Sequence, residues 1–508
     1  MIDGSPGGVA PSVARAPRPR MLSAFVTIGF LQIAVMLLQL VRTKVLAVLL
    51  GAEAIGIMGV IDKLLAVIAQ TVSLSFPFAA ARFLPALWTT DRAAFRSVFR
   101  GMRFVLTVTV GCTTVGAMVL ALVAPATWGH ELLPFQRTLL LALCTLPAVA
   151  ALPFLQNVFA GRLDQNGAMV VAVANGAVLT LAALIGAWWH GLSGFYGIYA
   201  VLGFAVTIGA IRFAERGTPP STDDFSQSWK SIPPAVWRFG AIIFLLAFLA
   251  PYAALFAHYR VLSEHGPLVA GWMQAAIGVS LIVRVALGAA HGAFLVPNVS
   301  RGGKAEDRIA WAHHFQWALC VICGLTVPVL VLFPDLVIRL LYSPQLAPGA
   351  KYAAVFVTAE FIGLVAATNQ MVIVALDHVV YYVVQNLAAQ LLLVVVAAAT
   401  IGPLGVFGAG VAGICAQLLL YGTTTVFLKR RYAAHTPRRT VATSVFVLTA
   451  IIVAGVVGTL WSDLTVSVVA SKVALYGGTV AGLWLLLSSS QRAEVVDAVK
   501  RVRARIFP

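Results

Sequence analysis

The sequence contains few charged side chains. Only 10% of its 508 residues are Asp, Glu, Lys or Arg, whereas 60% are hydrophobic. A chain with so little charge cannot bury its apolar side chains inside one water-soluble core. Runs of about 20 apolar residues, long enough to cross the hydrocarbon of a bilayer as a helix, follow one another along most of the chain. The composition therefore predicts an integral membrane protein.

Cysteine is also scarce, and its placement excludes a disulfide framework. All five cysteines fall in apolar segments: Cys112, Cys144, Cys320, Cys323 and Cys415. Cys320 and Cys323 have the spacing of half a metal site, but no second pair of ligands accompanies them. We interpret them as small apolar side chains and predict no metal site.

Catalytic motifs are missing. The sequence has no GxxxxGK[ST] phosphate loop, no HExxH zinc motif and no nucleophile elbow. We therefore expect neither ATP hydrolysis nor another enzymatic activity, and no cofactor.

The hydrophobic pattern predicts an all-α polytopic protein with fourteen membrane spans. They are 22–50, 55–85, 104–126, 138–160, 167–189, 194–211, 239–259, 268–297, 311–333, 353–376, 379–401, 404–428, 440–460 and 467–488. The segment 1–20 is rich in Gly, Pro, Ala and Arg, so we expect a disordered tail rather than a signal peptide.

The positions of Lys and Arg predict the orientation. With the N-terminus in the cytoplasm, 25 of the 35 basic residues fall in cytoplasmic segments and five in outer ones. Cytoplasmic loops of membrane proteins carry this excess, so both termini are expected inside. The net charge of +17 is explained in the same way, which argues against a nucleic-acid partner.

A weak internal repeat suggests two lobes. Gly51 and Gly56 follow the first span, and Gly266 and Gly271 recur with the same spacing about 215 residues later. Each pair is followed by a span that ends in proline, at Pro85 and at Pro297. Transporters are often built from such duplicated halves. The predicted parts are a disordered tail 1–21, an N-terminal lobe 22–211, a cytoplasmic linker 212–238, a C-terminal lobe 239–428, two further spans 429–488 and a basic tail 489–508.

The glycine segments resemble a known superfamily. LAVLLGAEAIGIMGV at 46–60 is similar to the LAxxLGxxGxG turn of oligosaccharide flippases of the multidrug/oligosaccharidyl-lipid/polysaccharide (MOP) superfamily. The segment 260–300 resembles the matching part of Wzx-type O-antigen translocases, with AGWMQA at 270–275 and Val296-Pro297 in place of Leu-Pro. The resemblance implies that the chain moves an undecaprenyl-diphosphate-linked oligosaccharide across the bacterial inner membrane, beside other polysaccharide export proteins.

Charged residues inside the predicted spans are the candidate site. Placing Arg, Lys or Asp at mid-bilayer is unfavourable by roughly 2.5 to 3.5 kcal/mol each, so such residues usually have a role. Arg284 lies about 24 Å into its span, close to the midplane. Our hypothesis is that five cations line a central cavity and bind the lipid diphosphate: Arg284, Arg42, Lys44, Lys63 and Arg82. The alternative is that they pair with Asp62 or Glu360, or extend to a membrane interface.

Other polar residues within the spans have two interpretations each. Glu360 and Asp62 either carry a coupling ion or neutralise a nearby cation. Asn386 and Gln390 are four residues apart on one helix face, where they would contact sugars or hydrogen-bond to a neighbouring helix.

Two other functions stay open. A cation-coupled drug exporter of the same superfamily would need a cavity with more acids than the sequence supplies. A membrane-bound glycan polymerase or ligase usually has one large outer loop, whereas the longest outer segment predicted here, 334–352, has about 19 residues.

Overall fold

The computed structural model describes residues 21–162, 164–216, 229–291, 304–461, 465–489 and 491–493, together with 295, 299 and 496. The described elements are all helical, as the hydrophobic pattern predicts. Ten of these helices are long and apolar enough to cross a membrane, or eleven if one bent pair counts as a span. The protein is therefore a multi-pass membrane protein.

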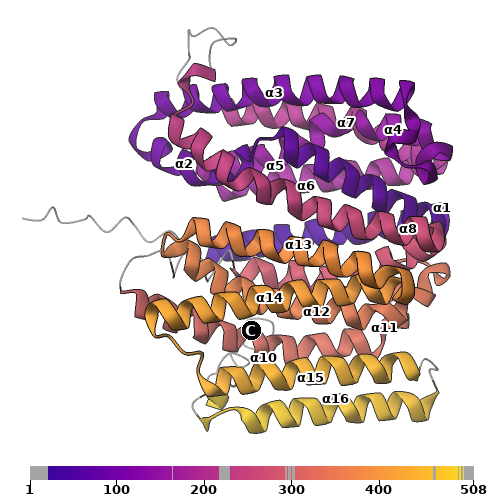
Figure 1. Ribbon diagram of the computed structural model, residues 1–508, viewed down its shortest axis with the longest axis vertical. Coiled ribbons are helices and arrows are strands. Elements are labelled where there is room, and N and C mark those ends of the chain that lie inside the picture. Colours follow the sequence, from indigo (N-terminus) through magenta and orange to yellow (C-terminus); the bar gives the residue numbers. More distant parts are fainter. Residues whose placement is uncertain are drawn as a thin grey trace, which may run out of the picture.

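The helices follow one another along the chain (Figure 1). The first group consists of α1 (Met21–Val72), α2 (Phe76–Thr90), α3 (Arg92–Val123), η1 (Pro125–Trp128), η2 (His130–Phe135), α4 (Gln136–Leu143), α5 (Leu146–Gly161), α6 (Gln165–Leu181), the π-helix η3 (Ala182–Ala187) and α7 (Trp188–Glu215). The second consists of α8 (Pro234–Ala290), α10 (Ala305–Leu332), α11 (Pro334–Leu341), η6 (Pro344–Gly349), α12 (Ala350–Ala375), α13 (Val379–Leu404), α14 (Val406–Tyr432), α15 (Arg438–Leu460) and α16 (Val466–Leu486).

The structure has ten such helices among the described residues rather than the fourteen predicted spans, mainly because three turns between predicted spans are very short. Gly51 in α1, Gly191 in α7 and Gly266 in α8 have positive φ angles of 79°, 60° and 83°. Glycine adopts this conformation without a Cβ clash, so the chain changes direction at one or two residues and resumes the helix at once. In three places, two predicted spans therefore follow each other with no loop between their helices.

Two predicted spans are instead divided. The span 55–85 is interrupted before α2, where Leu74 and Ser75 have positive φ, and the span 138–160 bends by 43° between α4 and α5. Pro77 and Pro147 stand in the first turns of α2 and α5. Proline has no N–H to continue the preceding helix, so both breaks follow from local sequence.

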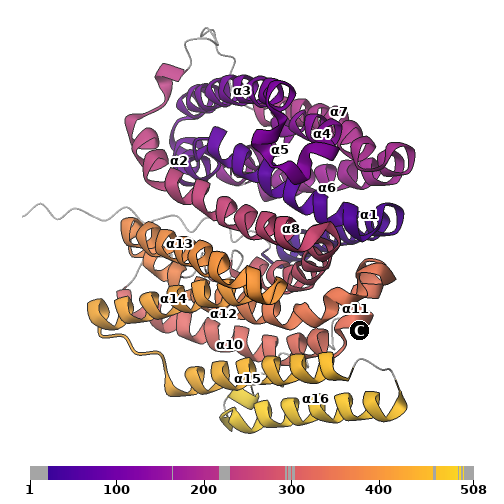
Figure 2. The same cartoon turned by 45° about the vertical axis from the view of Figure 1, so that its right-hand side comes forward.

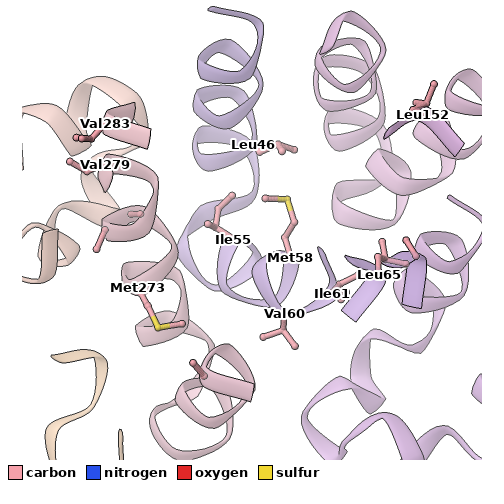
Figure 3. Packing of buried hydrophobic residues seen from close by; sticks show 14 of the residues in the cluster. Leu46, Ile55, Met58, Val60, Ile61, Leu65, Leu152, Met273, Val279 and Val283 are labelled. Carbon is pink, nitrogen blue, oxygen red and sulfur yellow. The ribbon is translucent and has the colours of Figure 1, made fainter. Parts of the chain in front are cut away.

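The helices form two bundles (Figures 1 and 2). Helices α2 to α7 lie in one and α10 to α16 in the other, while α1 and α8 run along the boundary. Buried apolar side chains of both boundary helices, among them Ile55 of α1 and Met273 of α8, pack at this boundary (Figure 3). The lobe boundaries 22–211 and 239–428 remain predictions.

Glycines allow α1 and α8 to touch backbone to backbone. A Cβ at Gly56 would lie 2.2 Å from the carbonyl oxygen of Pro267, and one at Gly271 would lie 2.1 Å from that of Ala52. Ala52 and Gly56 correspond to Pro267 and Gly271 in the predicted repeat. The two contacts are therefore reciprocal, as a two-fold relation between duplicated segments would produce.

Several predicted features lie outside the described residues. They are the tail 1–20 with its arginines, residues 217–228 of the linker, the Val296-Pro297 motif and most of the basic tail 489–508.

Candidate functional site

Arg284 of α8 forms a bidentate ion pair with Glu360 of α12. Its Nε and Nη2 donate to Glu360 Oε1 and Oε2, both at 2.7 Å. The Arg284 side chain is nevertheless 61% exposed in the protein, whereas that of Glu360 is 10% exposed. A guanidinium holds a carboxylate and a phosphate with the same fork of parallel N–H groups. Arg284 is thus both paired and accessible.

A second charged group lies between α1 and α7. Tyr196 donates a hydrogen bond of 2.7 Å to Asp62 Oδ1, and Arg42 and Lys63 are close enough to attract this carboxylate. Lys63 also lies within electrostatic range of Arg284. The predicted charges Arg42, Asp62, Lys63, Arg284 and Glu360 are therefore neighbours in space, although they come from three helices.

Arg42 lines two cavities. One of about 340 Å³ lies within the first bundle, where Gln39, Gln156 and Asn175 supply polar groups. A smaller one, of about 80 Å³, lies between α1, α8 and α11, and its wall includes Ile282 and Val285 beside Arg284. The buried Nε of Arg42 has no hydrogen-bond partner, and no carboxylate in the described part of the chain is within ion-pair distance. Its charge is available to a ligand.

Lys44 and Arg82 lie apart from this group. Lys44 Nζ donates a 2.6 Å hydrogen bond to the carbonyl oxygen of Arg339, in α11. Arg82 forms a 3.6 Å ion pair with Asp377, between α12 and α13, and its guanidinium lies 4.9 Å from the centre of the Phe239 ring. Both cations therefore connect α1 or α2 to the second bundle, and neither is shown in a cavity.

The amides of α13 have local partners. Asn386 Nδ2 donates to the carbonyl oxygen of Tyr382, one turn earlier, at 2.7 Å. Gln390 is half-buried. The neighbouring Gln385 is buried, and its Nε2 has no partner among the described residues. A role of Asn386 and Gln390 in sugar binding stays a prediction.

Several polar residues near these charges were not among the predicted site residues. Tyr199 donates to Asn175 at 3.3 Å, and buried His258 hydrogen-bonds to Gln274 at 3.0 Å, within electrostatic range of Lys63. Tyr196 and Tyr199 are three residues apart on one helix face, a spacing that was visible in the sequence. The partnership of His258 with Gln274 was not, because it spans the break at Gly266. Among the described residues, no group of three His, Cys, Asp or Glu could hold a metal ion.

No protein-family model and no curated protein matches the sequence, but solved structures do. The lipid II flippase MurJ, in an inward closed conformation, matches with a TM-score of 0.64 and 11% identity over 91% of this chain and 99% of that one. An inward-facing multidrug resistance MATE family transporter of the MOP superfamily matches with a TM-score of 0.61 and 11% identity, over 79% and 94%. This chain shares their fold.

A third match is a MOP superfamily transporter from Pyrococcus furiosus, described as having a binding pocket of reversed polarity. It matches with a TM-score of 0.52 and 13% identity, over 80% of this chain and 96% of that one. At such low identity these likenesses show the fold alone.

Proposed function

We propose that the chain flips an oligosaccharide linked to undecaprenyl diphosphate across the bacterial inner membrane, for polysaccharide or O-antigen export. Transport would occur by alternating access, in which the two bundles rock about a central cavity. The shared fold with a lipid II flippase and with other MOP transporters supports a transporter, and the motifs at 46–60 and 260–300 support the substrate class.

The observation that carries this proposal is the pair of accessible guanidiniums. Arg42 has no ion-pair partner in the described chain, and Arg284 is well exposed next to Val285, which lines one of the Arg42 cavities. With Lys63 they place three positive charges near two negative ones, Asp62 and Glu360. A lipid diphosphate would balance the excess, whereas a cationic drug would increase it.

Glu360 suggests how the substrate could be released. Its carboxylate takes the two N–H groups of Arg284 that a phosphate would use. Substrate binding must therefore displace Glu360, and its return would favour release. In this scheme the ion pair closes the site between transport cycles.

The same proposal includes the membrane topology. Dividing α1, α7 and α8 at their glycine breaks, and joining α4 to α5, produces fourteen spans. We place both termini in the cytoplasm, with lobes at 22–211 and 239–428, a linker at 212–238, and further spans at 429–488. The excess of Lys and Arg on one side supports this orientation.

The experiment that tests the function measures lipid-linked glycan on each side of the inner membrane in cells that lack the protein. Completed repeat units that accumulate facing the cytoplasm are expected. Units that reach the outer face but stay unpolymerised would indicate a polymerase or ligase instead. Normal glycan together with new sensitivity to cationic drugs would indicate an exporter, the alternative that the fold of the MATE transporter favours.

A further inference from the structure

A cavity that is separate from the two lined by Arg42 lies at the end of the second bundle where α10 begins and α14 ends. It has a volume of about 750 Å³ and is lined by the first turns of α10, the connection between α14 and α15, and the start of α15. The proposed orientation places it at the cytoplasmic surface of the membrane. None of the proposed substrate-binding residues lines it.

The cavity wall contains two buried polar side chains without partners. Trp317 is 4% exposed, and its buried Nε1 has no hydrogen-bond acceptor among the described residues. His313, one turn earlier, is 6% exposed, and its ring makes no hydrogen bond with any residue that the structure describes. Of the two, the His313 ring nitrogens are not among the buried atoms, so they are free to hydrogen-bond to a ligand in this cavity.

The rest of the lining is basic. Exposed His435, Arg438 and Arg439 surround the opening. Neither arginine has a carboxylate within ion-pair distance in the described chain, although Glu306 also lines the cavity. The N-terminus of α15 lies here too, and no side chain caps it. Unpaired N–H groups at a helix start attract anions, which adds to the positive charge.

An apolar groove adjoins this cavity. Arg438 lines both, and the groove, of about 630 Å³, continues along α15 past Val441, Val445 and Phe446 to Leu486 of α16. A basic cavity that opens into an apolar groove matches a molecule with an anionic head and a hydrocarbon tail. A free anion would fill the cavity and leave the groove unused.

We propose that this site binds an anionic phospholipid, whose phosphate contacts Arg438, Arg439 and His313 and whose acyl chain lies along α15. The proposal is independent of the transported substrate. It differs from general attraction to the negative inner leaflet because it requires a particular pair of arginines and a buried floor.

The test compares two pairs of arginines on the same side of the membrane. Arg430 and Arg431, at the end of α14, are equally exposed and lie outside the cavity. The full-length protein and the variants R438Q/R439Q, R430Q/R431Q and H313F are purified in neutral detergent. Binding of phosphatidylglycerol, phosphatidylcholine and inorganic phosphate is then measured by native mass spectrometry.

Phosphatidylglycerol is expected to bind the unaltered protein about ten-fold more tightly than phosphatidylcholine, because the choline cation of phosphatidylcholine offsets the negative charge that attracts the arginines. R438Q/R439Q should remove this preference, H313F should weaken phosphatidylglycerol binding several-fold, and R430Q/R431Q should leave both unchanged. Equal losses in the two double variants would overturn the proposal in favour of unspecific surface attraction. Displacement of the lipid by inorganic phosphate at equal concentration would show a site for a free anion and overturn the lipid assignment. H313F leaves both arginines in place and tests the site even if R438Q/R439Q does not fold.

Discussion

Arg284 donates two hydrogen bonds to Glu360, yet more than half of its side chain is exposed. Glu360 is only 10% exposed, so its carboxylate needs a cationic partner, whereas the guanidinium of Arg284 stays accessible to a ligand. We therefore attribute to this pair a part in binding and release of the substrate.

Replacing Arg284 separates charge from geometry. R284A should lower the rate of lipid-linked glycan flipping in proteoliposomes by about ten- to a hundred-fold, because a charge-assisted contact with the diphosphate is lost. R284K should retain part of the activity, since it keeps the charge but loses the fork of two N–H groups. R339K is the matched control, because Arg339 also pairs with an acid but lies in α11. Full activity of R284A and R284K at normal protein levels would contradict the assignment.

Replacing Glu360 tests the exchange mechanism. E360Q keeps the shape of the side chain but weakens its hold on Arg284, so the substrate should bind more tightly and leave more slowly. We expect the apparent KM for flipping to fall several-fold and the maximal rate to fall with it. E264Q, which alters the partner of Arg260 one turn away in α8, is the control. An unchanged KM would show that Glu360 does not compete with the substrate.

At the scale of helices, the crossing of α1 and α8 depends on glycine. Both Gly56 and Gly271 face backbone atoms of the opposite helix at distances that no Cβ could occupy. Backbone atoms cannot rotate away as side chains can, so any larger residue must push the helices apart.

G56A and G271A should therefore lower the thermal stability of the purified protein, by about 1 to 3 kcal/mol each, the usual effect of overpacking. The control is G111A in α3, where an added Cβ would meet nothing within 4 Å and helix propensity would improve. The melting temperature in detergent measures the difference. If G56A and G111A behaved alike, the helices would not be in contact at this crossing.

At the scale of the whole molecule, two polar contacts join the bundles at different places. Lys44 donates to the carbonyl oxygen of Arg339, and Arg82 pairs with Asp377. If the bundles rock during transport, these contacts must break at different stages of the cycle. Each would then bias the balance between conformations without affecting the substrate site.

The Arg82 pair can be tested by exchanging its charges. In R82A, the ratio of separated to closed bundles should rise by a few-fold, since a weak ion pair changes a two-state equilibrium by this amount. Spin labels on α3 and α15 measure the distribution of distances between the bundles. R82D/D377R should restore the original distribution. A distribution that R82A leaves unchanged would show that this pair does not hold the bundles together.

The local sequence by itself determined that this protein is helical and crosses a membrane, and where some of its helices break. Long apolar runs predicted a helical membrane protein, because every backbone polar group in hydrocarbon must be satisfied within its own helix. The glycines Gly51 and Gly266 likewise indicated the helix breaks, because glycine alone adopts a positive φ without a steric clash. The count of spans was less certain from the sequence, because a one-residue break and a loop look alike in a hydrophobic pattern.

Only the tertiary structure decided which charges meet. Arg284 and Glu360 are 76 residues apart, and Asp62 and Tyr196 are 134 apart. Lys44 lies two residues after Arg42, but it donates a hydrogen bond to the carbonyl oxygen of Arg339 in α11. Such pairings depend on how helices dock and rotate about their axes, which composition and spacing within one span do not encode. Sequence could thus name the charged residues, and the packing of α1, α7, α8 and α12 determined which of them are close together.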